Sequence, residues 1–267
     1  MADIFNPVRT RLAAGEPVFA MTVLVPSAEI AAQAAHLGFD FLWVEMEHSQ
    51  VSLESLRNMV LASRGAPAAI FARVPVNELW TAKRVLDAGV QGVIFPFTST
   101  PELAKQAVDA CRYPPAGKRG SGFGLAAFAW PESPSYHDAA DANVFVIAIV
   151  EEGRAVEKID EIAATPGLDA LFIGINDLSF SLGLRGRQDH PKQIEAIAKI
   201  VAAAKRHNLP LGRPAATPEE TIEFRKQGFS FFQLTTELGF MKAGAQDFLK
   251  AAGRSPGSSK SALKAIY

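Results

Sequence analysis

Two carboxylates and an imidazole follow an apolar stretch near the N-terminus. Residues 39–44 are apolar or aromatic except for Asp40, and the chain then continues with Glu45, Glu47 and His48. An apolar run of this length is typical of a strand buried on both faces. Because charge is costly to desolvate, ionisable groups at the end of such a strand indicate a site that binds or converts a ligand.

Other apolar stretches also end in polar side chains. Arg73 ends one stretch, Glu151 follows a second, and Asn176 and Asp177 come shortly after a third. Carboxylate oxygens suit Mg²⁺ or Mn²⁺, which keep positions free for water and substrate. An arginine matches a carboxylate or enolate oxygen. Together these residues predict a hard divalent metal and an anionic substrate at one rim of the protein.

Structural roles compete with these chemical ones. Glu151 could place its charge at a helix N-terminus, and Asp177 could equally be the N-cap of the next turn. His48 could be a rim histidine with satisfied hydrogen bonds. Asp87 lies at a predicted helix end, where the macrodipole disfavours a carboxylate, so we expect it to have a partner such as a histidine of this or another subunit. Arg73 at the end of an apolar strand has no evident structural role.

The chain between these residues alternates strand and helix patterns. The predicted strands are 18–25, 39–46, 69–74, 92–97, 144–150, 170–173, 209–213 and 231–234. Strands that alternate with helices form parallel sheets. Eight such units after one leading helix favour a (β/α)8 TIM barrel with an extra N-terminal helix over an open doubly wound sheet. The barrel would bring the strand ends, and so the polar residues, to one mouth.

One segment interrupts the alternation. Residues 113–124 form a proline- and glycine-rich loop that continues into an irregular segment through Tyr136, and loops of this length are usually functional or mobile. We predict a single domain over residues 1–252 and a flexible tail over residues 253–267.

The lysines argue against an imine mechanism. A Schiff-base aldolase needs a lysine in the barrel interior, usually on a strand. The lysines considered for this role all fall in predicted helices or loops: Lys83, Lys105, Lys118, Lys158 and Lys205. Metal chemistry is therefore favoured.

Composition narrows the range of partners. Lysine plus arginine number 27 and aspartate plus glutamate 28, so nothing favours nucleic acid or an anionic membrane. The single cysteine, Cys111, excludes an internal disulfide and is expected to be buried and inert. Without a secretory pattern or an apolar run of roughly 20 residues, the sequence predicts a soluble cytoplasmic protein.

Several motifs, in order along the chain, resemble the HpcH/HpaI aldolase family. The resemblance covers about residues 15–250, and its most specific parts are a Tyr-Pro-Pro-Ala-Gly-x-Arg-Gly run and a Gly-x-x-Asp-Leu-Ser turn. The motifs that carry it are Glu47-His48, Arg73, the run 112–120, Val150-Glu151 and the run 172–179. The resemblance implies a metal-dependent class II aldolase that acts on 2-keto acids.

The resemblance also implies residue roles. His48 matches the catalytic base, Arg73 the group that stabilises the transition state, and Asp87 the carboxylate that raises the basicity of the histidine. Glu151 and Asp177 match the two ligands of a Mg²⁺, Mn²⁺ or Co²⁺ ion.

Further implied roles concern the substrate and the assembly. The segment Gly174, Ile175, Asn176 and Asp177 would hold the carboxylate of pyruvate at a helix start. Glu45 and Glu47 would orient the histidine or the water molecules on the metal without binding the metal themselves. The family implies a homohexamer, a trimer of dimers, with the C-terminal helix exchanged between partners.

Four positions depart from the family pattern. Ile149 replaces a glutamine, Ile175 a proline, Asn176 an alanine and Glu45 an aspartate. The metal and base positions are kept, whereas the pocket for the keto acid or the acceptor is altered.

The predicted function is reversible cleavage of a 4-hydroxy-2-keto acid to pyruvate, or a related keto acid, and an aldehyde. One alternative is a citrate lyase β-like carbon–carbon lyase acting on a CoA thioester, which would need a basic groove such as Lys118, Arg119 and Arg185 could form. The other is a barrel that binds keto acids without turnover.

Overall fold

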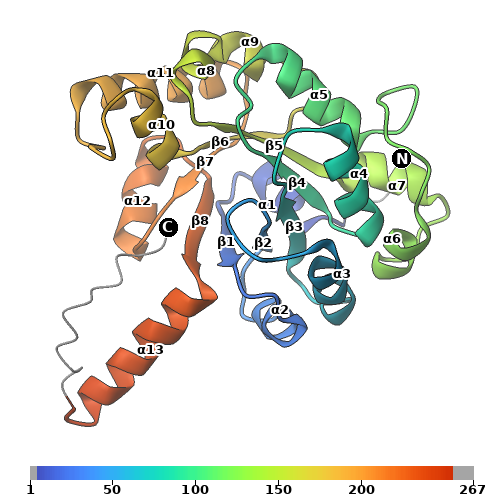
Figure 1. Cartoon of the computed structure of the whole chain (residues 1–267), viewed down its shortest axis with the longest axis horizontal. Helices are drawn as coiled ribbons and strands as arrows, with labels where there is room; N and C mark the ends of the chain where they lie inside the picture. The colour runs from blue at the N-terminus through green and yellow to red at the C-terminus, as the bar shows by residue number, and fades with distance from the viewer. Residues whose placement is uncertain (1–4, 255–267) are drawn as a thin grey trace.

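The strands close into a parallel barrel in the computed structural model, which describes residues 5–254 (Figure 1). Each strand pairs with the next along the chain, and β8 pairs with β1. The strands are β1 Val18–Val23, β2 Phe41–Glu45, β3 Ala69–Arg73, β4 Gly92–Phe95, β5 Phe145–Val150, β6 Ala170–Ile173, β7 Leu211–Pro214 and β8 Phe231–Thr236. The predicted (β/α)8 fold is confirmed.

Helices surround the barrel and connect its strands. They are α1 Pro7–Ala13, α2 Ala28–Ala34, α3 Leu53–Ala62, α4 Leu79–Ala88, α5 Pro101–Cys111, α6 Gly124–Ala129, α7 Tyr136–Asn143, α8 Gly153–Glu157, α9 Ile159–Ala163, α10 Ile175–Ser181, α11 Pro191–Arg206, α12 Pro218–Lys226 and α13 Glu237–Ala251. No helix within residues 5–254 is long and apolar enough to cross a bilayer.

The barrel interior is filled by aromatic side chains. The ring centroid of Phe41 lies 4.6 Å from that of Phe71 and 4.9 Å from that of Phe231. A Cβ at Gly212 would lie 2.5 Å from Phe231 and 2.6 Å from Phe172, so glycine is needed there. Since successive side chains of a strand alternate between its faces, the same alternation turns the last residues of several strands toward the barrel axis.

The N-terminal helix closes the opposite end of the barrel. The Asn6 side chain accepts a hydrogen bond from Val8 N–H at 3.1 Å, and Pro7 occupies the first helical turn, as predicted. Asn6 also donates to the carbonyl groups of Gln91 and Asn143 at 3.0 and 2.8 Å. This network ties α1 to the barrel, where Val8 joins the interior cluster.

The structure is more regular than predicted in the segment that breaks the alternation. Helices α6 and α7 lie within residues 113–143, and Ser135 caps α7 by accepting from Asp138 N–H at 3.3 Å. These short helices were not predicted because prolines and glycines are frequent in this part of the sequence. After β5 the chain forms two short helices instead of one, because Lys158 leaves the helical conformation between α8 and α9.

The C-terminal helix extends away from the barrel (Figure 1). No residue of α13 is buried, and Met241 and Phe248 are 65% and 74% exposed. Most of the predicted tail, residues 255–267, lies outside the described residues.

Candidate active site

Glu45 is the central acceptor at the C-terminal mouth of the barrel. It is 1% exposed, and its Oε1 accepts the backbone N–H groups of Glu47 and His48 at 2.7 and 3.0 Å. Its Oε2 accepts from Trp43 Nε1 at 3.3 Å and from Arg73 Nε at 2.6 Å. One carboxylate thus fixes the start of the loop after β2 and the guanidinium on β3.

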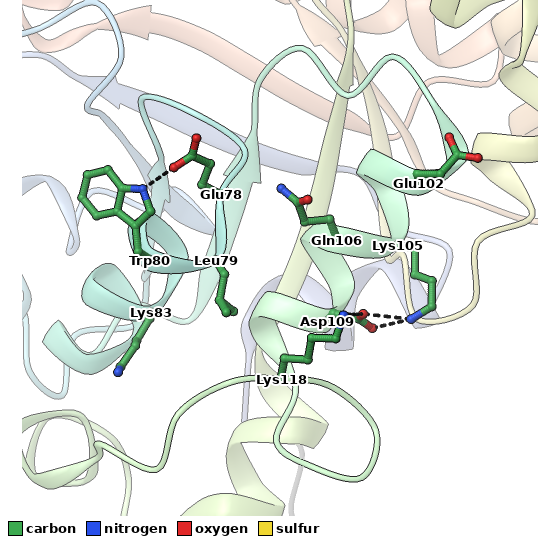
Figure 2. A pocket seen from close by; sticks show the side chains of 9 residues that line it. All are labelled: Glu78, Leu79, Trp80, Lys83, Glu102, Lys105, Gln106, Asp109 and Lys118. Carbon is green, nitrogen blue, oxygen red and sulfur yellow. Dashed lines mark hydrogen bonds and ion pairs between the residues drawn. The ribbon is translucent and has the colours of Figure 1, made fainter.

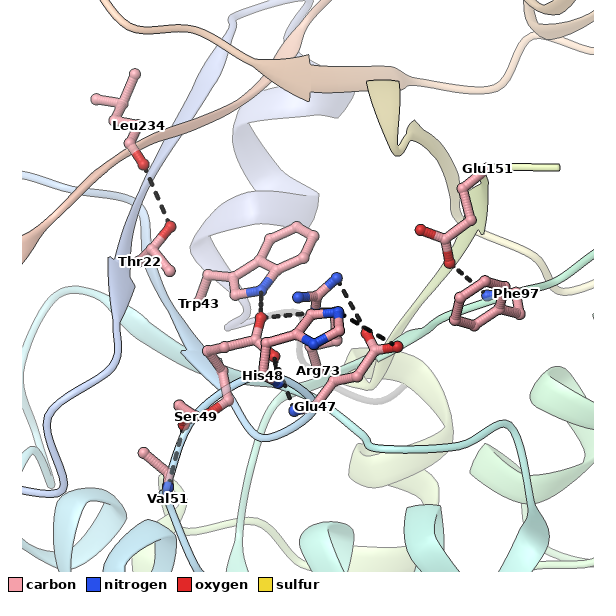
Figure 3. Close-up of polar contacts among 11 residues, drawn as sticks. Thr22, Trp43, Glu47, His48, Ser49, Val51, Arg73, Phe97, Glu151 and Leu234 are labelled. Atoms are coloured by element: carbon pink, nitrogen blue, oxygen red, sulfur yellow. Dashed lines mark hydrogen bonds and ion pairs between the residues drawn. The ribbon is translucent and has the colours of Figure 1, made fainter. Parts of the chain in front are cut away.

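Arg73 lies inside the mouth because of strand register. It is the partner of Glu45 across β2 and β3, and it is 9% exposed. Its second contact is Nη1 with Glu47 Oε2 at 3.0 Å (Figure 3). Both carboxylates keep the guanidinium charged, so Arg73 can stabilise negative charge on a bound oxyanion.

His48 lies at the solvent side of this group. Its side chain is 50% exposed, and its Nε2 is 3.8 Å from Glu47 Oε1 (Figure 3). Ser49 Oγ donates to the backbone carbonyl of Glu45 and accepts from Val51 N–H at 3.0 Å, which closes the turn. The imidazole is therefore held near Glu47 while it remains accessible to a ligand.

Glu151 is a buried carboxylate on the other side of the mouth. It is 2% exposed, and its Oε1 accepts the backbone N–H of Phe97 at 2.6 Å (Figure 3). Burial, together with the charges of Glu47 and Asp177, raises its pKa to about 8. A helix-start role is ruled out, because Glu152 and not Glu151 precedes α8.

Gly174 provides the space that Glu151 occupies. A Cβ at this position would lie 2.6 Å from Glu151 Oε2 and 3.1 Å from Ile149 Cγ2. Gly174 is also the N-cap of α10 and offers no side-chain acceptor, so the first-turn N–H groups of that helix have no side-chain cap. The geometry suits a small anion near the predicted carboxylate-binding segment.

Asp177 lies in the first turn of α10 and is exposed. It is not an N-cap, since Gly174 holds that position. Its charge raises the pKa values of both Glu47 and Glu151, for which burial is the leading cause. The charges of Glu47, Glu151 and Asp177 therefore interact at the mouth.

This set of carboxylates fits a divalent cation. Burial and mutual repulsion disfavour ionised Glu47 and Glu151, and a cation would offset both effects. In the described part of the chain no group of three or more His, Cys, Asp and Glu side chains is placed so that it could by itself hold a metal ion. Glu151 and Asp177 are only two ligands, a number that suits Mg²⁺ with water and substrate oxygens.

Asp87 is placed away from this group within the chain. It lies in the last turn of α4, and helices of a (β/α)8 barrel run back toward the opposite end from the strand mouths. Arg119 is its partner, with Nη2 3.8 Å from Asp87 Oδ1. Burial raises the pKa of Asp87, although Arg119 opposes the change. Within a single subunit, Asp87 therefore does not lie close to His48.

Arg213 points away from the mouth, although it ends the predicted seventh strand. Its guanidinium carbon lies 3.5 Å from the centroid of the Phe224 ring on α12. Burial lowers its pKa to about 10. It has a packing role between β7 and the outer helix.

A surface groove of about 760 Å³ lies between α4 and α5 (Figure 2). Trp80 and Leu79 line one side of it, while Lys118 extends from the loop after α5 and pairs with Asp109 at 3.3 Å. Apart from Lys118, which was considered for a CoA-binding groove, none of the residues predicted to have a function lines it. It is a feature of the outer helices.

Two residues of the mouth were not predicted from the sequence. Phe97 supplies the N–H that holds Glu151, and Trp43 supplies an N–H to Glu45. A backbone donor leaves no signal in residue type. Trp43 could have been found from its position two residues before Glu45 on one strand, because residues i and i+2 share a face.

The fold and the mouth define a barrel enzyme with its polar groups at the C-terminal strand ends. Residues 20–242 match the HpcH/HpaI aldolase/citrate lyase family. The chain is 32% identical over 256 residues to a hydroxypyruvate/pyruvate aldolase of Paraburkholderia phytofirmans, covering 94% of this chain and 98% of that protein. It is 34% identical over 209 residues to a 5-keto-4-deoxy-D-glucarate aldolase of Salmonella arizonae, covering 78% and 82%.

A solved structure shows the same likeness. An HpcH/HpaI aldolase/citrate lyase family protein from Burkholderia cenocepacia superposes with a TM-score of 0.85 and 32% identity over 93% of this chain and 99% of the other. The chain belongs to the HpcH/HpaI aldolase/citrate lyase family, as its motifs predicted. It is an enzyme of the carbon–carbon lyase class.

Proposed function

We propose that this enzyme cleaves a 4-hydroxy-2-keto acid reversibly to pyruvate, or a related 2-keto acid, and an aldehyde with the help of Mg²⁺ or Mn²⁺. The observation that carries the proposal is the convergence of Glu47, Glu151 and Asp177 beside Arg73. A metal-dependent reaction on an anion needs both acidic ligands and a cationic side chain, and this mouth has both. The similarity to a hydroxypyruvate/pyruvate aldolase and to a 5-keto-4-deoxy-D-glucarate aldolase supports the same chemistry.

Glu151 and Asp177 would hold the cation. When bound, it would act as a Lewis acid toward the carboxylate and keto oxygens of the keto acid. The uncapped N–H groups at the start of α10 would receive the substrate carboxylate, with Gly174 leaving room for the approach.

The protein's own groups would stabilise charge and move the proton. Arg73 would stabilise the negative oxygen of the enolate, because Glu45 and Glu47 orient its guanidinium before substrate arrives. In cleavage His48 would take the proton from the 4-hydroxyl as the C3–C4 bond breaks, and a proton would then pass from it to the methylene carbon of the enolate to give pyruvate; addition would run the same transfers in reverse. The half-exposed position of His48 allows it to reach the substrate without rearrangement of the barrel.

The CoA-thioester alternative has weaker support. Of the residues suggested for a basic groove, Arg119 has a side chain that is 0% exposed and packs with its guanidinium carbon 4.6 Å from the centroid of the Tyr113 ring. Lys118 is exposed but is paired with Asp109. The geometry therefore favours the aldolase over a CoA lyase.

The assembly remains part of the proposal. The unburied α13, with exposed apolar side chains such as Phe248, is suited to an exchange between partner subunits within a homohexamer. In such an assembly Asp87 would approach the His48 of another subunit and raise its basicity. A light-scattering mass of six chains is the expected result, and a monomer would contradict this part.

The proposed activity is tested by condensation of pyruvate with an aldehyde panel. We expect product with Mg²⁺, Mn²⁺ or Co²⁺, loss of activity with a chelator, and loss in a Glu151→Ala variant. Retention of metal-dependent activity in Glu151→Ala would show that the ligand assignment is wrong. Tight binding of pyruvate without product from any aldehyde would instead favour a keto-acid-binding barrel.

A further inference from the structure

Phe97 has two features that do not stabilise the fold. Its backbone is left-handed, with φ of 48°, a region in which a bulky side chain crowds the backbone. Its side chain is 44% exposed, although the ring is large and apolar. A residue with both features calls for a functional explanation.

The surrounding hydrogen bonds hold Phe97 in this conformation. Its N–H donates to Glu151 Oε1 at 2.6 Å. The next residue, Thr98, is fully buried; its N–H donates to the Ile149 carbonyl at 3.2 Å and its Oγ1 to the Phe95 carbonyl at 3.1 Å. Because the backbone is anchored at both residues, the Cα of Phe97 is fixed and its side chain lies beside Glu151 (Figure 3).

The two sides of the mouth differ in what they expose to a ligand. The charged groups Glu45, Glu47 and Arg73 come from β2, β3 and the loop after β2. The side built from β4 and β5 carries Glu151 at 2% exposure and, more exposed to solvent, the Phe97 ring at 44%. A ligand would therefore meet the Glu151 carboxylate at depth on this side and the hydrocarbon of the Phe97 ring nearer to solvent.

Exposure indicates which reactant this wall contacts. Glu151 is 2% exposed, so a keto acid held at this carboxylate lies deep in the mouth. The more exposed ring of Phe97 lines the outer part, which is left for the second reactant. The acceptor aldehyde is that reactant.

We propose that Phe97 forms an apolar wall of the acceptor subsite, so that the enzyme prefers aldehydes with a hydrocarbon substituent over hydroxylated ones. This inference rests on the proposed aldol function and adds the class of acceptor to it. The fixed loop keeps the Cα of Phe97 in position before the aldehyde binds, which lowers the entropic cost of the contact.

The test compares aldehydes with pyruvate as the common donor. Propanal and glycolaldehyde have the same number of heavy atoms but differ by a methyl in place of a hydroxyl. In the wild type we expect kcat/KM to favour propanal, and to rise about tenfold from propanal to pentanal as two more methylene groups are buried.

A Phe97→Asn variant removes the ring and keeps the backbone. Asparagine tolerates a left-handed conformation and retains the N–H that binds Glu151. We expect a melting temperature no lower than that of the wild type, and the rise from propanal to pentanal should shrink to about twofold or less. Asn208→Gly is the matched control, because Asn208 has a similar φ of 54° in the turn before β7, at the other end of the barrel.

The outcomes separate this inference from the proposed function. An unchanged aldehyde preference in Phe97→Asn would overturn the acceptor wall. If the oligomeric mass changed at the same time, the ring would be an interface contact instead. Failure of the wild type to exchange the methyl protons of pyruvate with solvent, with metal present, would overturn the aldol function itself and this inference with it.

Discussion

Glu45 and Arg73 face each other across strands β2 and β3 and form a buried ion pair, with Arg73 Nε 2.6 Å from Glu45 Oε2. Strand register places the two residues opposite each other, and side-chain alternation turns both into the barrel mouth. The remaining oxygen of Glu45 binds the N–H groups of Glu47 and His48. The pair therefore links the residue proposed to stabilise charge with the loop that carries the proposed base.

The variant Glu45→Gln tests this link. An amide leaves Arg73 buried without its closest carboxylate, and loss of one partner of a buried pair costs about 3 kcal/mol in unfolding free energy. We also expect kcat to fall while the metal dependence of the melting temperature is kept, because neither proposed metal ligand is altered. Urea unfolding measures the first effect. A stability equal to that of the wild type would show that the pair is not structurally coupled to the barrel.

Gly174→Ala tests the close approach of Gly174 to Glu151. Its Cβ would lie 2.6 Å from Glu151 Oε2, so the carboxylate would have to move. We expect at least a tenfold weaker Mn²⁺ affinity, measured by calorimetry, since a ligand displaced by about 1 Å binds poorly. Gly183→Ala is a control for a new methyl group in open space, although its φ of 77° adds backbone strain. Equal Mn²⁺ affinity in Gly174→Ala and the wild type would contradict the proposed role of Glu151.

The raised pKa of Glu151 predicts how stability depends on pH. Its pKa rises from 4.5 to about 8 on folding, so the folded protein binds the proton more tightly than the unfolded chain. The resulting stabilisation is complete below the unfolded pKa and is lost as the pH rises through about 8. Glu47, whose pKa is also raised by burial, acts in the same direction.

Metal-free protein should therefore become less stable between about pH 5 and pH 8, and Glu151→Gln should lose much of this decline. Added Mg²⁺ should raise the melting temperature of the wild type more at the upper end of this range, because the cation binds the ionised carboxylate. Thermal unfolding with a chelator and with Mg²⁺ measures both effects. A decline of equal size in Glu151→Gln would assign it to other groups.

The variant His48→Gln tests whether His48 contributes to catalysis without contributing to stability. The His48 side chain is 50% exposed, so we expect little change in melting temperature. Removal of a general base should lower kcat for cleavage by about 10²–10⁴-fold. His207→Gln is the control, since His207 lies after α11 and pairs with Asp160 at 3.4 Å. If both variants kept full activity, His48 would not be the base.

Strand ends were the most predictable part of the site. The barrel followed from eight alternating units, and Glu45, Arg73 and Glu151 followed from their positions at the ends of apolar runs. These inferences work because parallel strands place their C-terminal ends at one mouth. The shared direction of Glu45 and Arg73 follows from strand register, which pairs the two residues.

Contacts made by backbone groups and by outer elements could not be predicted. The Phe97 N–H that binds Glu151 depends on a left-handed turn at a residue type that disfavours it. Arg213 ends a strand like Arg73, but its neighbour Gly212 takes the inward position, so the arginine packs outward on Phe224. Single strand-end residues therefore require the register of the whole barrel before a role can be assigned.

Metal-dependent exchange of the pyruvate methyl protons with D2O tests the central claim most directly. The experiment compares wild type, Glu151→Gln and the neighbouring control Glu152→Gln, whose carboxylate binds Ser99 and Arg154 outside the mouth. The account predicts exchange with Mg²⁺ or Mn²⁺ in the wild type and in Glu152→Gln, and none in Glu151→Gln or with a chelator. Exchange that persists without metal, or in Glu151→Gln, would contradict it.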